Sequence, residues 1–163
     1  LDSLTGVMGR KMFLNKCMAL QKNRALLKSK AKGWFLFFDV DAFKSINDTY
    51  GHLVGDEVLC GFAKRLEKAL SPYGVVGRLG GDEFAAILHK PITENALAAL
   101  LDDLYKDLAD ILPQQKVTCS IGVCSFTYPQ EIRKLMYATD KALYKAKERG
   151  RACYVFGEAE SKE

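Results

Sequence analysis

Two short apolar runs joined by a pair of glycines constrain the fold of this chain more than any other feature. The segments 75–76 and 84–88 are apolar and lie on either side of Gly80-Gly81. This pattern predicts a β-hairpin, because glycine tolerates positive φ at both positions of a tight turn. Asp82 and Glu83 would lie at the tip, where glycines let a charged ligand approach the backbone closely. The pattern is typical both of a solvated hairpin tip and of a site for a metal and a phosphate.

A second group of acids follows the most apolar segment of the chain. Residues 34–38 are all apolar or aromatic, which predicts a strand buried on both faces. Asp41 is favoured as the N-cap of the helix that follows. Asp39 has no such role, and a buried acid is costly unless it pairs or binds a metal. Asp39 with Asp82 or Glu83 of an adjacent strand would form a hard-oxygen site suited to Mg²⁺, with phosphates completing its shell.

The chain has 163 residues, a length typical of one domain with a substantial core. No apolar run approaches the ~20 residues of a membrane span, and the N-terminus shows no signal-peptide pattern. We therefore expect a cytoplasmic domain without membrane contact, although its parent protein can be membrane-anchored. The chain starts at Leu1 rather than Met, which indicates a piece excised from a longer multidomain protein.

Charge and cysteine usage argue against several classes of function. The net charge is +4, and the sequence has no long basic tract, so nucleic-acid binding is not predicted. The five cysteines are scattered and form no Cys-x-x-Cys pair. They predict neither a zinc site nor a disulfide framework, and we expect reduced thiols.

Hydrophobic periodicity predicts one continuous domain over residues 1–157, followed by a polar tail over 158–163. The expected helices cover residues 10–27, 42–48, 56–70, 93–112 and 132–148, Gly51 and Gly55 bracket a turn, and the expected strands cover 34–40, the hairpin at 75–88, 116–126 and 152–156. This order predicts an α+β fold with a ferredoxin-like mixed sheet flanked by helices.

Five motifs, in order along nearly the whole chain, resemble those of the GGDEF family of diguanylate cyclases. They are Asp2-Ser3-Leu4-Thr5-Gly6, the segment from Asp39 to Asp56, Gly80-Gly81-Asp82-Glu83-Phe84, Ser120-Ile121-Gly122-Val123 and the segment from Ala138 to Arg151. The resemblance implies a single catalytic domain with a fold related to nucleotidyl cyclases and polymerase palms. It also implies a bacterial second-messenger enzyme that condenses two GTP into cyclic di-GMP and two pyrophosphates at a two-fold dimer interface.

The resemblance assigns the metal ligands to the two acidic segments. Asp39 would bind Mg²⁺ or Mn²⁺ through its carboxylate, and Val40 through its backbone carbonyl. Asp82 would be the second carboxylate ligand, and Glu83 would assist the second of two ions. Asp82, Glu83 and Lys44 would be the catalytic residues. The family commonly places the general base at Asp82, but a metal-bound carboxylate is a poor base, so Glu83 is the other candidate.

The resemblance assigns the terminal phosphates of GTP to two helix ends. Lys44 and backbone N–H groups near Ala42 and Phe43 would hold them at the start of a short helix. Lys147 and Arg151 would reach the same phosphates from the last helix, on one helical face if the helix extends to Arg151. Without the resemblance, a basic helix end that complements the helix dipole would explain both residues.

The guanine base is assigned to Asn47 and Asp56. An aspartate accepts from the ring N1–H and the exocyclic amine together, a pair of donors that adenine lacks. Asp56 could instead cap the helix that it is expected to start. His52 would be at most a pocket wall or a ribose contact, and Gly80 and Gly81 would let the nucleotide approach the hairpin.

Three departures from the family pattern matter. Ser71 and Gly74 stand where the family often has an Arg-x-x-Asp product site, so feedback inhibition through that site is not expected. Gly9 and Ala152 each replace an asparagine, which predicts lost local hydrogen bonds. By contrast, Asp56 matches the family pattern, which argues against a branch that makes mixed cyclic GMP-AMP.

Two other functions fit parts of the pattern. A GTP-binding sensor or interaction module would have lost turnover, but degenerate members usually lose acids that this chain keeps. A relative of polymerase palms or adenylyl cyclases would share the fold and the two-metal chemistry, but not the five motifs. We therefore expect an active cyclase whose partners are GTP, a second copy in a transient homodimer and an upstream sensor domain.

Overall fold

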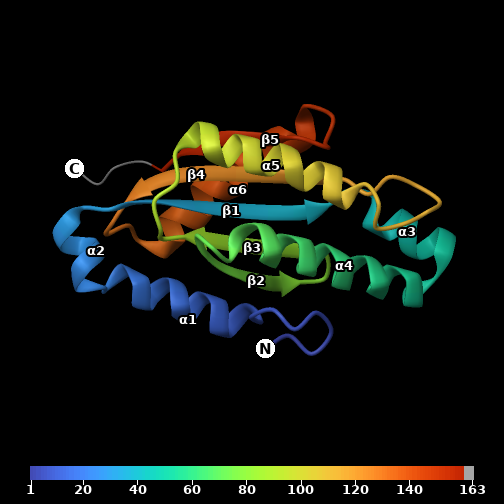
Figure 1. Ribbon diagram of the computed structural model, residues 1–163, viewed down its shortest axis with the longest axis horizontal. Coiled ribbons are helices and arrows are strands. Elements are labelled where there is room, and N and C mark those ends of the chain that lie inside the picture. Colours follow the sequence, from blue (N-terminus) through green and yellow to red (C-terminus); the bar gives the residue numbers. More distant parts are fainter. Residues whose placement is uncertain (160–163) are drawn as a thin grey trace.

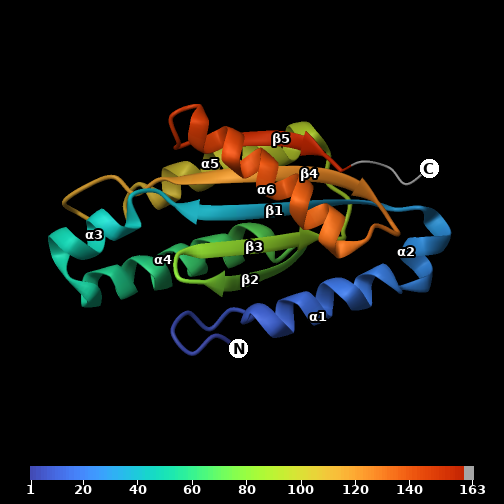
Figure 2. The ribbon, with the colours of Figure 1, turned by 180° about the vertical axis from the view of Figure 1, so that it is seen from behind.

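A five-stranded sheet in the order β2-β3-β1-β4-β5 carries helices on both faces (Figure 1 and Figure 2). The computed structural model describes residues 1–159. The strands are β1 (Lys32–Val40), β2 (Gly74–Gly80), β3 (Glu83–Leu88), β4 (Cys119–Thr127) and β5 (Tyr154–Glu158). The helices are α1 (Arg10–Gln21), α2 (Arg24–Ser29), α3 (Phe43–Tyr50), α4 (His52–Leu70), α5 (Glu94–Leu108) and α6 (Ile132–Glu148). This α+β architecture confirms the predicted fold class.

β1 lies at the centre of the sheet and pairs antiparallel with β3 and β4. β2 pairs antiparallel with β3, whereas β4 and β5 pair in parallel, which makes the sheet mixed. The four strands in the order β2-β3-β1-β4 form the expected ferredoxin-like unit, and β5 extends it. The predicted hairpin is confirmed, with Gly81 in its turn at φ +50°.

The sheet buries apolar side chains on both faces, because successive strand side chains point to opposite sides. Leu36, Phe38 and Val40 join a core that includes side chains of α4 and α5. Phe35 and Phe37 join a second core with side chains of α1 and α6. The prediction of a strand buried on both faces is therefore confirmed, and the alternation directs residue 39 toward the α6 side.

The predicted helix over 10–27 is two helices. α1 ends at Gln21, and the side chain of Asn23 accepts a hydrogen bond from the backbone N–H of Leu26 at 3.1 Å to start α2. Asn is a favoured N-cap because it satisfies a donor that lacks a partner within the helix. Asn23 was the signal for this break, inside a window whose apolar spacing is helical throughout.

The long helix begins four residues before its predicted start at Asp56. α4 starts at His52, directly after Gly51 at φ +89°. Asp56 lies in the second turn and is not an N-cap, and Gly55 is buried within the helix rather than at a turn. Two glycines four residues apart indicated a loop, but only Gly51 takes a positive φ.

The remaining boundaries differ by a few residues. α6 has the ends that were predicted, whereas β4 starts at Cys119 and β5 at Tyr154. Glu158 still pairs with Ser125 of β4, and Ala159 is buried. The first two residues of the predicted tail therefore pack against the domain, and 160–163 lie outside the described residues.

Two further properties bear on the setting of the domain. All five cysteines are free thiols. Across residues 1–159, none of the helices combines the length and the apolar character that crossing a bilayer requires.

Candidate functional site

An acid and a base meet at the carboxyl end of β1. Asp39 stands opposite Glu83 of β3 and Ser120 of β4 in the sheet register. Its carboxylate forms an ion pair with Lys147 of α6, and the two side chains keep 16% and 34% of their exposure. The expectation that Asp39 needs a partner is met by Lys147, a pair that the sequence analysis did not predict. Because the pair is partly open to solvent, another cation can replace the Lys147 ammonium group as the partner of Asp39.

Asp82 lies in the hairpin turn, next to Asp39. The backbone N–H of Val40 donates to the Asp82 carbonyl at 3.3 Å. Burial, a hydrogen bond with the Asp39 carboxyl and the charges of Asp39 and Glu83 raise the pKa of Asp82 to about 7. Like charges held this close disfavour the ionised form, so the turn attracts a cation.

This donor set fits a small divalent cation that binds together with a phosphorylated ligand. Within residues 1–159, no three His, Cys, Asp or Glu side chains are placed together so as to hold a metal ion. Asp39 and Asp82 thus supply only part of a coordination shell. Mg²⁺ is commonly held by one or two carboxylates, with waters and substrate phosphates as its other ligands.

The turn that carries Asp82 is open. A β-carbon added at Gly80 or Gly81 would meet nothing within 4 Å, and both glycines have positive φ. Glycine is needed here for backbone conformation rather than packing, and the space over the turn is available to a ligand. Glu83 beside it lines a cavity of about 420 Å³, together with Arg10 of α1 and other residues.

Arg78 links the hairpin turn to the N-terminal segment. Its Nε donates to the Gly81 carbonyl at 2.9 Å, and its Nη1 donates to the Asp2 carboxylate at 3.2 Å. Asp2 also accepts from the backbone N–H and the hydroxyl of Thr5. Burial alone would raise the pKa of Asp2, but the hydrogen bonds from Thr5 and Arg78 outweigh it and hold that pKa below its usual range. Arg78 was not among the site residues predicted from the sequence.

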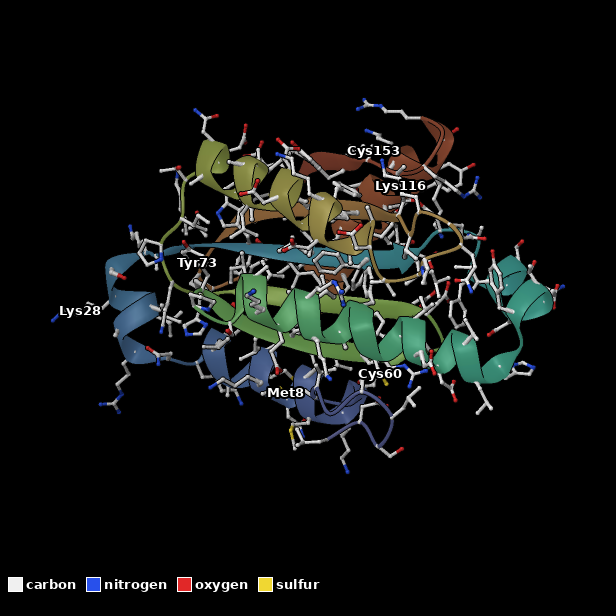
Figure 3. All side chains as sticks on the ribbon, turned by 45° about the vertical axis from the view of Figure 1, so that its right-hand side comes forward. Met8, Lys28, Cys60, Tyr73, Lys116 and Cys153 are labelled. Carbon is white, nitrogen blue, oxygen red and sulfur yellow. The ribbon has the colours of Figure 1, made fainter. Side chains whose placement is uncertain are left out.

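The same N-terminal segment is fixed against two other elements. The thiol of Cys60 in α4 donates to the Leu4 carbonyl at 3.2 Å, and Met8 forms an isolated bridge with Gly77 of β2. Figure 3 shows Met8 and Cys60 on the same side of the molecule. The N-terminal segment therefore packs against β2, the strand that leads into the hairpin turn, and helps to fix its position.

Because the pKa of Asp2 is lowered in the folded state, its contribution to stability is present above the unfolded pKa and is lost as pH falls through the folded value. We expect Asp2→Asn to lower the free energy of unfolding by about 1 kcal/mol near neutral pH. The gap to wild type should narrow below about pH 4. Urea unfolding at several pH values measures this gap. A gap that stays constant with pH would contradict the prediction, and the exposed Asp103→Asn is the control.

Asn47 of α3 presents a buried amide oxygen without a hydrogen-bond partner among the described residues. A β-carbon at Gly55 of α4 would stand 1.7 Å from that oxygen and 3.4 Å from the Phe43 ring. The absence of a side chain at Gly55 therefore makes room for the amide. Asp56 is exposed on the same helix, and His52 is exposed at its start. A buried unpartnered polar atom is rare in native proteins, which makes Asn47 a candidate for contact with a bound group.

Asp41 does not cap α3, so that prediction was wrong. The N-cap residue is Ala42, in a left-handed conformation and without a side-chain hydrogen bond. The Asp41 carboxylate accepts instead from Thr118 Oγ1 at 2.8 Å, Ser120 Oγ at 2.7 Å and the backbone N–H of Ala152 at 2.9 Å. Ser120 lies in β4, Thr118 lies just before it and Ala152 lies in the turn after α6, so local sequence does not reveal these partners.

The first turn of α3 can receive an anion. Phe43 and Lys44 are its first two residues, and Lys44 is exposed. The first N–H groups of a helix have no acceptor within it and favour phosphate binding. Lys44 lies beside these groups, and its role in phosphate binding stays a prediction.

Arg151 does not share a helical face with Lys147, because the helix does not extend to Arg151. α6 ends at Glu148, and Gly150, Arg151 and Ala152 follow with φ of +102°, +65° and +49°. Lys147 stays in the last turn of α6, where it forms the ion pair described above. Arg151 lies in a left-handed turn just beyond.

Comparison with known proteins agrees with this geometry. The family model "Diguanylate cyclase, GGDEF domain" matches residues 1–153. The probable diguanylate cyclase DgcI of Escherichia coli K12 is 39% identical over 153 residues, which cover 93% of this chain and 32% of that protein. The diguanylate cyclase DgcM of the same strain is 35% identical over 154 residues, which cover 92% and 36%. The chain thus spans about a third of these relatives.

Solved structures show the same fold. Diguanylate cyclase SiaD of Pseudomonas aeruginosa, solved with its activator SiaC, superposes with a TM-score of 0.83 at 31% identity, over 95% of this chain and 60% of that one. The GGDEF domain of Caulobacter crescentus DgcB, solved with c-di-GMP, gives 0.84 at 26% identity, over 98% and 93%. With matched motifs, shared fold and these relatives, the chain belongs to the GGDEF domain family of diguanylate cyclases.

Proposed function

We propose that this domain joins two GTP molecules into cyclic di-GMP and releases two pyrophosphates. The observation that carries the proposal is the neighbouring pair of carboxylates Asp39 and Asp82, where burial and then the hydrogen bond and charge of Asp39 raise the pKa of Asp82 to about 7. Such a pair is suited to a divalent cation. Lys147 beside it and the unpartnered amide oxygen of Asn47 supply a phosphate partner and a base contact.

Members of the GGDEF family are generally metal-dependent. We assign two Mg²⁺ or Mn²⁺ ions per site to the carboxylates of Asp39 and Asp82 and the backbone carbonyl of Val40, and Glu83, whose exposed side chain is not yet placed with these two, would turn toward the second ion. When bound, the ions lower the pKa of the ribose 3′-hydroxyl and offset charge on the leaving pyrophosphate. Lys147 would then leave its ion pair with Asp39 and pair with a phosphate oxygen of GTP.

The remaining groups hold GTP. Asn47 and Asp56 bind the guanine edge, and His52 lies one helical turn before Asp56. Lys44, with the first N–H groups of α3, binds the terminal phosphates, as does Arg151 from the turn after α6. The open Gly80-Gly81 turn lets the reacting phosphate approach the two carboxylates.

Two groups remain as candidates for the general base. Burial and the neighbouring Asp39 raise the pKa of Asp82 to about 7, which favours its protonated form when no cation is bound. Asp82 would accept the 3′-hydroxyl proton only in its ionised form, which a bound cation would favour. Glu83, exposed beside the turn, is the alternative acceptor.

The reaction requires two copies of the domain. Each 3′-hydroxyl attacks the α-phosphate of the other GTP, and a two-fold axis delivers both attacks with one site design. We therefore propose a transient homodimer, controlled by an upstream sensor domain in a parent protein. The domain acts on cytoplasmic GTP and needs neither nucleic acid nor a membrane surface.

Mass-resolved product analysis with GTP and Mg²⁺, over a series of protein concentrations, tests this function. Cyclic di-GMP should appear at a rate that rises more steeply than the protein concentration. GTP binding without product at any concentration, with Mn²⁺ tried as well, would contradict turnover and favour a regulatory GTP-binding module.

The missing product-inhibition site cannot be restored by simple substitution. Gly74 begins β2, and a β-carbon there would stand 2.0 Å from the backbone carbonyl oxygen of Ile87. We expect Ser71→Arg with Gly74→Asp to lower the free energy of unfolding by about 2 kcal/mol or more and to gain no inhibition by cyclic di-GMP. Thermal melts and product-inhibition assays measure both, with Ser71→Arg alone as the control. A stable double variant that cyclic di-GMP inhibits would overturn this expectation.

A further inference from the structure

One carboxylate joins three separate segments at the edge of the proposed site. Asp41 Oδ1 accepts from Ser120 Oγ, and Oδ2 accepts from Thr118 Oγ1 and from the backbone N–H of Ala152. The backbone N–H of Asp41 also donates to the Thr118 carbonyl at 3.0 Å. Both carboxylate oxygens are thus already bound, so Asp41 is neither a helix cap nor a spare metal ligand.

The turn that Asp41 holds is conformationally costly. Gly150, Arg151 and Ala152 all have positive φ, and two of them carry a β-carbon. A left-handed conformation costs a non-glycine residue roughly 1–2 kcal/mol. The turn therefore needs outside contacts to persist. Its backbone makes three, from Gly150 N–H to the Lys147 carbonyl at 3.3 Å, from Arg151 N–H to the Ala146 carbonyl at 3.1 Å and from Ala152 N–H to Asp41, and only the last reaches outside α6.

Two acids attach the same end of α6, but they do so differently. Asp39 holds Lys147 through an ion pair, and under the proposed function both partners leave this pair for the metal and the phosphates. The Asp41 carboxylate accepts a hydrogen bond from the backbone N–H of Ala152. It also accepts hydrogen bonds from the hydroxyl groups of Thr118 and Ser120. No substrate group competes for these donors, so this attachment persists when the ion pair opens.

We propose that Asp41 is a positioning residue, which fixes the turn after α6 so that Arg151 meets the phosphates of GTP when Lys147 releases Asp39. The inference rests on the proposed function, because it assumes that Arg151 binds phosphate. Asp41 itself contacts no substrate. It acts through the backbone of Ala152, one residue beyond Arg151.

Asp41→Asn tests this, because the amide keeps the shape but places NH₂ against at least one of the three donors. We expect the affinity for GTP to fall about 10-fold, while the affinity for guanosine, which has no phosphate, stays within about 2-fold. Calorimetric titration of GTP and guanosine measures both. Asp103→Asn, the same change on an exposed part of α5, should leave both unchanged. Equal losses for the two ligands would indicate a merely structural role and overturn the inference.

A double-mutant cycle with Arg151→Ala tests whether Asp41 acts through Arg151. In the Arg151→Ala background, Asp41→Asn should cost less than about 3-fold in GTP affinity, since the group that it positions is gone. A full 10-fold loss in that background would overturn the inference. If Asp41→Asn does not fold, Thr118→Val removes one donor and should give a smaller loss of the same selectivity for GTP.

Failure of the proposed function gives a different result. If the wild type binds GTP but forms no cyclic di-GMP, turnover fails while the titrations still decide the role of Asp41. If the wild type binds guanosine and GTP equally well, no phosphate contact exists and the positioning role fails with it.

Discussion

Replacing Asp82 with asparagine should slow cyclic di-GMP formation by at least about 1000-fold, because losing an anionic metal ligand removes several kcal/mol of transition-state stabilisation. Asp82 contributes one of the two carboxylates that crowd the hairpin turn, and a neutral amide cannot replace its charge. Quantifying product at saturating GTP and Mg²⁺ measures the loss. GTP affinity should change far less, because Asn47 and Asp56 are untouched. Turnover within about 10-fold of wild type would contradict this role for Asp82.

The same substitution should stabilise the fold when divalent cations are removed. The pKa of Asp82 is raised in the folded state, so its favourable contribution is present below the unfolded pKa and is lost as pH rises through about 7. With a chelator present above that pH, Asp82→Asn should therefore melt at a higher temperature than wild type. A variant that is less active but more stable than wild type is expected when a functional residue is replaced. A variant that misfolds would instead be less stable than wild type.

The parts of the fold that sequence predicted are those that local pattern determines. The apolar run at 34–38 and the Gly80-Gly81 turn gave a buried strand and a hairpin, because alternation and left-handed glycine are properties of a few neighbouring residues. The helix over 132–148 was predicted to the residue. The break at Asn23 was missed since the apolar spacing continues through it.

The contacts that assemble the site depend on the fold and were not predicted. Arg78 reaches Asp2 across 76 residues of sequence, and Asp41 reaches Ala152 across 111. No periodicity links such positions, and the favourable capping chemistry of Asp41 pointed to the wrong partner. The motif resemblance supplied the proposed roles of Lys147 and Arg151, but Arg151 follows α6 in a left-handed turn that the sequence pattern did not predict. Asp2→Asn and Asp41→Asn, proposed above, each disturb one of these long-range contacts.

Adding a single methyl group at Gly55 should weaken GTP binding by at least about 10-fold. The β-carbon of Gly55→Ala would stand 1.7 Å from Asn47 Oδ1 and 2.9 Å from its Cγ, so the amide must move. Alanine is otherwise the better helix residue by about 1 kcal/mol, which separates the expected loss of binding from any weakness of the helix. GTP titration and thermal melting of the same variant measure the two effects.

Gly61→Ala, in the same helix, is the matched control. Its β-carbon would meet the end of the Arg65 side chain at 3.1 Å and Ile111 at 3.3 Å, contacts that small shifts relieve. It should bind GTP like wild type and match or exceed its melting temperature. If Gly55→Ala also binds GTP normally, the buried amide of Asn47 does not read guanine. Asp56 alone would then have to distinguish guanine from other bases. Its carboxylate is exposed, so guanine would compete with water for every hydrogen bond that this carboxylate accepts.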